Sequence, residues 1–547
     1  MNHISRRSFV ATLSAAGLAP SAFAHGREGA PNRGAAGFLH GVASGDPLHD
    51  RVILWTRITP QQWTDEVQGC WYMATDAKMK RICCSGGFAT DITRDFTVKI
   101  DACGLEPGKT YYYRFETRGS ASPIGRTRTL RFGKTDALRL AFVSCSNFPY
   151  GYFNAYARIA ERNDLDFVVH LGDYIYEYAL GEYAAPALAG IRDVKPVNEI
   201  VSLIDYRMRH ALYKTDADLQ EVHRQQPFIC VWDDHEAAND AYRDGAENHN
   251  PEQGEGAWQV RRRHAVRAYN EYMPIRSRSV FDDKVYRHFR IGDLADLIML
   301  DTRLHGRDKQ AAFMTGQADL PVTDPVIADP QRTLLDFDQE QWLERKLWSS
   351  KQRGAHWRIL GQQVMMAQLS ATFGQTIINP DQWDGYAPAR QRLFRNFIDN
   401  DIHNNVVLSG DIHSSWCNDL SVNPWDPAVG YDPASGSGVV GVEFVTPAVT
   451  SPGPFPDAAT AAVVAAQLKF VSPHMKYIDL SQRGYGILDV TRQRALCEIY
   501  HVASVAARSP EQRLAASFVS QAGHNVLQPA TANAPAQVLA DPAPAAN

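Results

Sequence analysis

Apolar and polar residues alternate in short runs along the first part of the chain, which is the pattern of β-strands with one buried face. The runs RVILWTRI, GCWYMATD, DFTVKIDA and KTYYYRFETRG are rich in β-branched and aromatic residues, and turn-forming residues separate them. We therefore expect a small all-β domain over residues 36–134.

From about residue 137 the pattern changes to compact apolar runs, which are typical of strands buried on both faces. LRLAFVSCS and LDFVVHLGD are two such runs, and the helical stretch GYFNAYARIAERN lies between them. Because β-α-β crossovers are right-handed, the two strands are expected to be parallel. Further strands are predicted at FICVWDDHE, DLIMLDTR, HWRILGQQVMM, NNVVLSGDIH, VEFVTPAV and GYGILDV, with helices at DFDQEQWLERKLWSSK and ARQRLFRNFIDN.

The expected fold class is therefore α/β, with a domain over residues 135–510 that follows a small all-β domain. LEPGKTYYYRF places a Pro-Gly turn before an aromatic strand, as is common in immunoglobulin- and fibronectin-like sandwiches. Residues 237–275 are polar and predict a helical excursion over the site, and residues 305–335 predict a long loop. The Ala/Pro-rich end, residues 525–547, is predicted to be disordered.

The N-terminus has the features of an export signal. MNHISRRSFVATLSAAGLAPSAFA combines the pair Arg6 and Arg7, an apolar segment and a small-residue cleavage site. We expect a twin-arginine signal peptide over residues 1–24, with the Tat export machinery as a partner and a periplasmic or secreted mature protein. The alternative is a short N-terminal helix. Since this pathway exports folded proteins, it suits an enzyme that acquires metals in the cytoplasm.

Composition narrows the possibilities further. The chain has 547 residues, which favours two domains. Its formal net charge is -5, so we expect no basic field and no stable nucleic-acid partner. After residue 30 no run of about 18 apolar residues occurs, so no membrane span is expected in the mature chain. Eight cysteines in a chain of this length do not make a disulfide scaffold, and their pairing stays open.

Side chains that bind metals follow the predicted strands at their carboxyl ends, where sites form in open α/β sheets. Each has an ordinary alternative: Cys145 as a buried small residue, Asp173 as a helix cap, His413 as a structural histidine. Together, thiol, carboxylate, phenol and imidazole at one edge predict a metal site. The strand ends are Ser144–Asn147, Gly172–Tyr176, Asp233–Glu236, Gly361–Gln363 and Gly410–His413.

The order of the motifs GD-x-x-Y, D-D-H-E and G-D-x-H resembles that of calcineurin-like metallophosphoesterases. The forms SCSN, HLGDYIYEY, VWDDHEAAND, LGQQVMM and LSGDIHSSW, with the leading HGVASGDPLHDRVILWTR, resemble the alkaline phosphatase D (PhoD-like) family over residues 38–500. The resemblance implies a metallophosphoesterase β-sandwich flanked by helices. It also implies an exported phosphatase or phosphodiesterase that cleaves phosphate esters with a metal-activated hydroxide.

The resemblance further implies an iron–calcium site. Carried over to this sequence, the Fe³⁺ ligands are Cys145, Asp173, Tyr176 and His413, and the Ca²⁺ ligands are Asp173, Asp234 and Asp411. The donor types of these residues agree with this assignment, because thiolate, phenolate and imidazole suit a transition metal, whereas carboxylates suit Ca²⁺. Zinc or manganese stays possible for the second metal. Gln362 or Gln363 stands where the superfamily often has another histidine.

Catalytic roles follow from the same motifs. His235 is expected to protonate or stabilise the leaving alkoxide, with Asp234 and Asn147 also at the reacting centre. Glu236 would orient His235 or be an ordinary surface acid. Asn147 is a candidate phosphate or metal contact. Arg303 either pairs with Asp301, which we favour, or binds the substrate phosphate.

Two other functions compete with this interpretation. A purple-acid-phosphatase-like enzyme would have a histidine-rich second site, but Asp234, Gln363 and Asp411 remove the expected nitrogens. A non-catalytic surface-binding protein with a degenerate hydrolase domain would be expected to lack ligands that are present here. The preference for monoesters or diesters, the physiological substrate and the oligomeric state stay open.

Overall fold

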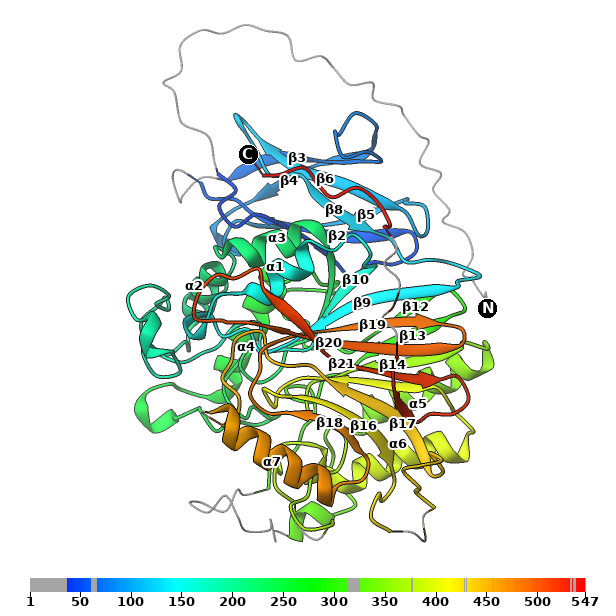
Figure 1. Ribbon diagram of the computed structural model, residues 1–547. Coiled ribbons are helices and arrows are strands. Elements are labelled where there is room, and N and C mark those ends of the chain that lie inside the picture. The colour runs from blue at the N-terminus through cyan, green and yellow to red at the C-terminus, as the bar shows by residue number, and fades with distance from the viewer. Residues whose placement is uncertain are drawn as a thin grey trace, which may run out of the picture. The chain divides into compact units, whose positions relative to one another are not determined.

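The computed structural model describes residues 37–546 apart from 61–65, 312–324, 375–376, 427, 429, 456, 532–533 and 535–537. The expected signal peptide, residues 1–24, lies outside the described residues, as does the centre of the expected 305–335 loop. Strands in the described part of the chain form three sheets, of ten, seven and five strands. Figure 1 shows these sheets with the helices around them.

The ten-stranded main sheet has the order β22-β21-β20-β19-β9-β10-β11-β1-β2-β5. Strands β9, β10 and β11 are parallel, and α1 (Asn154–Ala160) connects β9 to β10, as predicted. The strands are β1 (Val42–Gly45), β2 (Arg51–Arg57), β5 (Thr97–Cys103), β9 (Ala137–Val143), β10 (Phe167–His170), β11 (Pro227–Cys230), β19 (Gly484–Thr491), β20 (Arg494–Val502), β21 (Gln512–Gln521) and β22 (Leu527–Pro529).

The all-β region at the N-terminus is a two-layer sandwich, as expected, but it shares one layer with the rest of the protein. Strand β1 pairs in parallel with β11, with Ser44 opposite Pro227, so β1, β2 and β5 extend the main sheet. The second layer is a separate five-stranded sheet of β3 (Val67–Ala74), β4 (Ile82–Thr90), β6 (Thr110–Thr117), β7 (Ser120–Ala121) and β8 (Gly125–Arg128). Leu54, Met73 and Phe115 lie in the core between the two layers.

The seven-stranded second sheet packs against the main sheet, and the alternation of its side chains separates two cores. Ile359 and Val406 join the core that contains Phe142 of the main sheet, whereas Leu360 and Val407 join the core under α5 and α6. The strands are β12 (Arg287–Ile291), β13 (Ala295–Met299), β14 (Trp357–Gly361), β15 (Asn405–Ser409), β16 (Ser415–Ser421), β17 (Val439–Val445) and β18 (Met475–Asp479).

Helices lie along the main and second sheets (Figure 1). The predicted α5 (Phe337–Gln352) and α6 (Ala387–Asp399) lie on the second sheet, and α3 (Ala217–Gln225) packs near β1 and β11. The remaining helices are α2 (Leu203–Tyr213), α4 (Trp258–Tyr272) and α7 (Ala458–Val471). Helix α4 supplies the expected helical part of residues 237–275. Each helix in the described part of the chain is too short or too polar to cross a bilayer.

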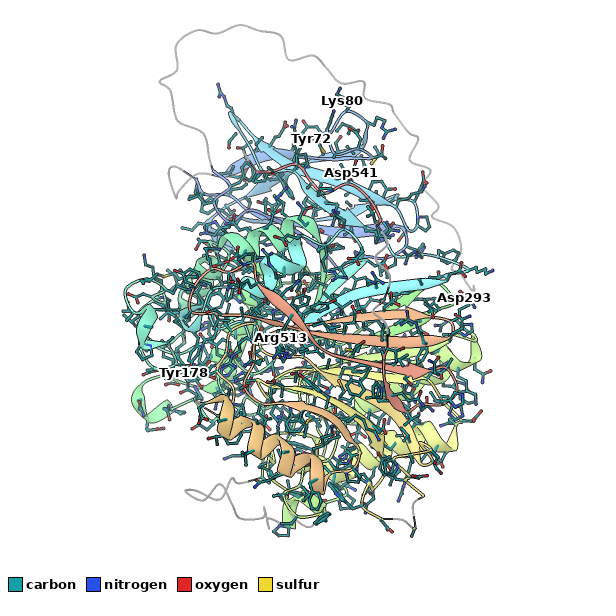
Figure 2. All side chains as sticks on the ribbon, viewed as in Figure 1. Tyr72, Lys80, Tyr178, Asp293, Arg513 and Asp541 are labelled. Carbon is teal, nitrogen blue, oxygen red and sulfur yellow. The ribbon has the colours of Figure 1, made fainter. Side chains whose placement is uncertain are left out.

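The C-terminal part of the chain differs from the prediction. Strands β20, β21 and β22 follow the last predicted strand, and α7 was not expected. Part of the segment predicted to be disordered is described by the structure: β22 pairs with β21, and neighbouring side chains hydrogen-bond to the backbone of residues 538–546. The Tyr112 hydroxyl donates to the Asp541 carbonyl at 2.7 Å, and the Ala543 amide donates to Gln225 Oε1 at 2.9 Å. Figure 2 labels Asp541 beside the N-terminal sheet. All eight cysteines are described, and all are free thiols.

Lys214, which directly follows α2, is a buried lysine. Its ammonium lies 4.7 Å from the centre of the Trp55 ring and 4.9 Å from that of Tyr174, and among the described residues no carboxylate pairs with it. Burial lowers the pKa of Lys214 from 10.5 to about 7. Between these values the unfolded chain holds a proton that the folded chain does not, so the free energy of unfolding rises with pH.

Lys214→Met is therefore expected to stabilise the protein at pH 7 and to remove a pH dependence on the order of 4 kcal/mol between pH 7 and pH 10. Urea unfolding at several pH values measures the difference between the variant and the wild type. Lys134→Met, at an exposed position, is the control and should leave the pH dependence unchanged. An equal slope in wild type and Lys214→Met would show that Lys214 titrates normally.

Candidate metal centre

Four strand ends converge on one site. Cys145 follows β9, Asp173 follows β10, Asp234 follows β11, and Asp411 and His413 follow β15 of the second sheet. The ligand atoms of Cys145, Asp173 and His413 all lie within 4.8 Å of one another, and so do those of Asp233, Asp234 and Asp411. A third group of the same size joins Asp173, Asp234 and His235. The structure therefore brings the strand-end side chains together.

The backbone at these positions is held in an unfavourable conformation. The φ angles of Cys145, Asp173, Asp411 and His413 are 61°, 56°, 65° and 53°, in the left-handed region that residues other than glycine rarely adopt. Such strain persists where the surrounding structure enforces it, and it concentrates at functional sites.

The two glycines of the GD motifs are required by close packing between the strand ends. A Cβ atom on Gly172 would lie 2.3 Å from Asp233 Cβ, and one on Gly410 would lie 2.5 Å from Ser144 Oγ. These contacts are too short for any side chain, so glycine lets the strand ends approach closely enough to share a site.

The Tyr176 hydroxyl lies beside the first group of candidate ligands. It donates to Asp173 Oδ2 at 3.0 Å, lies 3.2 Å from His413 Nε2, and accepts a hydrogen bond from Ser451 at 2.6 Å. Asp173 Oδ1 is buried and has no partner among the described residues. Burial and the neighbouring Asp173 carboxylate raise the pKa of Cys145 well above its usual value. A thiolate here would therefore need a cation beside it.

The second group consists mainly of carboxylates, and Arg303 lies among them. Its guanidinium is fully buried and pairs with Asp233, with Asp381 at 2.8 Å and with Asp411 at 2.6 Å. The favoured structural role of Arg303 is thus supported, although its side-chain partners are these acids and not Asp301. The predicted contact of Arg303 with substrate is not supported, because no part of the side chain is exposed. Burial raises the pKa of Asp411 to about 6, although Arg303 opposes the shift.

An open cleft of about 400 Å³ exposes part of this site. Cys145, Tyr176 and Asn147 do not line the cleft and lie behind its wall. The Asn147 amide donates to the Tyr183 carbonyl at 2.9 Å, and its Oδ1 is buried without a partner among the described residues. The predicted phosphate contact of Asn147 therefore has no direct support in this geometry. Residues that line the cleft include Asp173, Tyr183, Asp234, His235, Asp240, Asn379, Asp381, Asp411 and His413.

Glu177, which was not among the predicted site residues, orients His235. Glu177 Oε2 lies 2.7 Å from His235 Nδ1, and the Asn248 amide and the Asn239 backbone hold the other carboxylate oxygen. Burial alone would lower the pKa of His235, but the carboxylates of Asp234 and Glu177 outweigh it and raise that pKa well above its usual value. Glu177 belongs to the HLGDYIYEY motif, so its position after the GD pair was the available signal.

Glu236 does not orient His235, and it is not a surface acid. Its buried carboxylate accepts hydrogen bonds from the backbone amides of Asp173, Tyr174 and Asp233, at 3.1, 2.6 and 2.8 Å. Glu236 therefore holds two of the strand ends against each other. Both expectations for this residue are wrong, because the carboxylate is directed toward the adjacent loop.

Gln362 and Gln363 are likewise structural in the folded chain. Gln363 accepts from Thr302 and donates to the carbonyls of Trp232 and Leu300, and Gln362 donates to Ser409. Neither residue lines the cleft. Two other residues lie beside the second group of carboxylates. Asp381 lines the cleft, and the adjacent Gln382 donates to Asp411 Oδ2.

Known proteins match this chain, which has two packed sheets flanked by helices and a polar cleft at the carboxyl ends of their strands. Residues 140–499 match the sequence model of the PhoD-like phosphatases, and residues 22–131 match that of the N-terminal domain of PhoD-like phosphatases. The chain belongs to the PhoD-like phosphatase family and is a phosphoric ester hydrolase.

Among its relatives is alkaline phosphatase D of Bacillus subtilis (strain 168), which is 38% identical over 476 residues, 84% of this chain and 77% of that protein. A solved structure described as the structure of PhoD superposes with a TM-score of 0.81 at 35% identity, over 92% of this chain and 94% of that one. The resemblance inferred from the motifs is thus confirmed.

Proposed function

We propose that this chain is an exported, metal-dependent alkaline phosphatase and phosphodiesterase, which hydrolyses phosphate esters at the cleft described above. The observation that carries the proposal is one cluster of a thiol, a phenol, an imidazole and several carboxylates, of which the imidazole and most of the carboxylates line the cleft. The N-terminal residues 1–24 support export by the twin-arginine pathway to the periplasm or the medium. A non-catalytic binding protein is not favoured, because the ligands that degeneration would remove are present.

The charge of the site supports bound cations. Only two guanidinium groups, those of Arg303 and Arg307, pair with the carboxylates in the described residues around the cleft. Buried carboxylates without enough positive charge are costly, and metal ions relieve that cost. The buried or nearly buried carboxylates are Asp173, Asp233, Asp234, Asp240, Asp381 and Asp411.

The donor types support different metals in the two groups. Cys145, Tyr176, Asp173 and His413 would hold Fe³⁺, because thiolate, phenolate and imidazole suit a Lewis-acidic transition metal. Asp173, Asp234 and Asp411 would hold Ca²⁺ through oxygen. Asp233, whose carboxylate lies within 4.8 Å of those of Asp234 and Asp411, would be a further candidate ligand for this second metal. Arg303 and Gln382 already donate to Asp411, so a metal there would use the remaining lone pairs of that carboxylate.

Metals bound at these residues would neutralise phosphoryl charge and lower the pKa of a water molecule. The chain itself contributes a proton donor for the leaving group. His235 lines the cleft, and its Nδ1 faces Glu177, which leaves Nε2 to hold the proton that the departing alkoxide takes up. Because Glu177 favours the imidazolium form, His235 stays protonated until the ester bond breaks.

Elemental analysis of the mature protein, together with its visible absorption spectrum, tests the metal assignment. We expect iron and calcium, and a charge-transfer band from the thiolate and phenolate ligands. Cys145→Ser should bleach or shift the band, whereas Cys103→Ser, at an exposed position outside the site, should not. Zinc or manganese in place of iron and calcium, with no band, would contradict the assignment and leave the phosphatase function intact.

A further inference from the structure

A second and larger cavity, of about 1130 Å³, adjoins the catalytic cleft. The two share Asn379, Ile412 and Pro454 as lining residues. Leu369, Ile378, Trp416, Val464, Leu468 and Phe470 line much of the rest, and we call this cavity the α7 groove. Among the described residues, no side chain with a formal charge lines it. The cleft with its carboxylates and a groove without charged side chains therefore meet at these three shared residues.

Helix α7, which forms one side of the groove, is mostly apolar, yet most of its residues are exposed or only partly buried. Its sequence, AATAAVVAAQLKFV, contains one charged residue, Lys469, and Ala461 is the one buried residue among the described side chains of the helix. Val463 is 59% exposed and Phe470 is 79% exposed. A helix of this composition is normally buried. Figure 1 shows α7 at the outside of the fold, next to β18.

The rim of the groove adds further exposed apolar surface. Phe373 is 56% exposed, and its ring centre lies 6.0 Å from that of Phe470. Ile378, five residues further along the same segment as Phe373, is also exposed. Exposed apolar patches of this kind on a soluble fold mark binding surfaces. A substituent on a phosphate in the cleft would reach this patch if it extended past Ile412.

We propose that the α7 groove binds an acyl chain of a phospholipid whose phosphodiester group occupies the catalytic cleft. This inference rests on the proposed function and names its substrate class. A single molecule would need a phosphate at the polar end and a hydrocarbon chain at the apolar end, and a phospholipid has both. In the reaction a water oxygen bonds to phosphorus and one P–O ester bond breaks. The leaving alkoxide takes up a proton, so the products are a phosphomonoester and an alcohol.

A series of p-nitrophenyl alkyl phosphodiesters tests the groove, because every member has the same leaving group. We expect kcat/KM to rise about threefold for each methylene that enters the groove, and at least about 100-fold from the methyl to the octyl ester below its micelle concentration. Dihexanoylphosphatidylcholine should likewise be a better substrate than glycerophosphocholine. If the enzyme clearly prefers a geranyl ester to a decyl ester, its substrate is an isoprenoid phosphodiester and not a phospholipid.

Variants at exposed groove residues connect this preference to the structure. Val463→Asn and Phe470→Ser should each reduce kcat/KM for the octyl ester about tenfold and leave the methyl ester unchanged. Ile398→Asn, at an exposed position on α6, is the matched control and should change neither rate.

Equal rates for the methyl and octyl esters would overturn the acyl-chain site and leave the proposed phosphodiesterase activity standing. Loss of activity toward all esters in metal-replete enzyme would overturn the proposed function itself. If Val463→Asn or Phe470→Ser alters the oligomeric state and leaves the preference for longer alkyl esters intact, the groove binds a second copy of this protein and not an acyl chain.

Discussion

Asp173→Asn is expected to lower kcat/KM for p-nitrophenyl phosphate by about three orders of magnitude and to reduce the metal content of the protein. Asp173 is the residue common to the group with Cys145 and His413 and the group with Asp234 and His235. Removing its charge therefore weakens both metal positions at once. Asparagine tolerates the left-handed backbone that Asp173 adopts, with φ of 56°, so the fold should be preserved.

Asp293→Asn is the matched control for this substitution. Asp293, labelled in Figure 2, is a partly exposed carboxylate that pairs with Arg492 outside the site. Its loss should change neither metal content nor activity, because surface ion pairs contribute little. Full metal content and full activity in Asp173→Asn, with thermal unfolding unchanged, would rule out a shared role for Asp173.

His235→Gln is expected to lower kcat for an alkyl phosphate by about 100- to 10,000-fold with metal content unchanged. The loss should be much smaller for p-nitrophenyl phosphate, because p-nitrophenolate leaves without needing a proton. Glu177→Gln should show the same dependence on the leaving group with a smaller loss, about tenfold to 100-fold, since it acts only through His235. Comparing kcat over a series of esters with leaving groups of different basicity measures this dependence.

His249→Gln serves as the control for His235, since His249 pairs with Glu255 and does not line the cleft. Its replacement should leave the leaving-group dependence as it is in the wild type. An equal loss for alkyl and p-nitrophenyl esters in His235→Gln would mean that His235 binds the phosphoryl group and does not donate the proton. That outcome would also assign Glu177 a purely structural role.

The local sequence was sufficient to place most of the candidate metal ligands. Cys145, Asp173, Asp234 and Asp411 each come directly after an apolar strand, and parallel strands bring their carboxyl ends to a common edge. Glycine before Asp173 and Asp411 marked the tight turns, which the close contacts of Gly172 and Gly410 explain. The motif order then identified the family, because it combines several short patterns whose joint occurrence is specific.

Contacts between segments far apart in the chain could not be predicted in this way. Glu177 meets His235, 58 residues away, and Arg303 meets Asp411, 108 residues away. A polar residue after a strand shows that the strand ends there, but it does not show which partner its side chain reaches. For the same reason Glu236 was expected beside His235, its neighbour in sequence, although it binds the backbone of another loop.

The sequence by itself thus determined the family, the fold class and the strand ends that supply the candidate ligands, because hydrophobic periodicity and short motifs are local properties. Tertiary structure alone decided that β1 joins the main sheet through β11, that Arg303 lies among the carboxylates, and that α7 stays exposed beside the cleft. Strand pairing, ion pairing and burial depend on which distant segments pack together. An apolar helix such as α7 has the same sequence pattern whether another segment covers it or not.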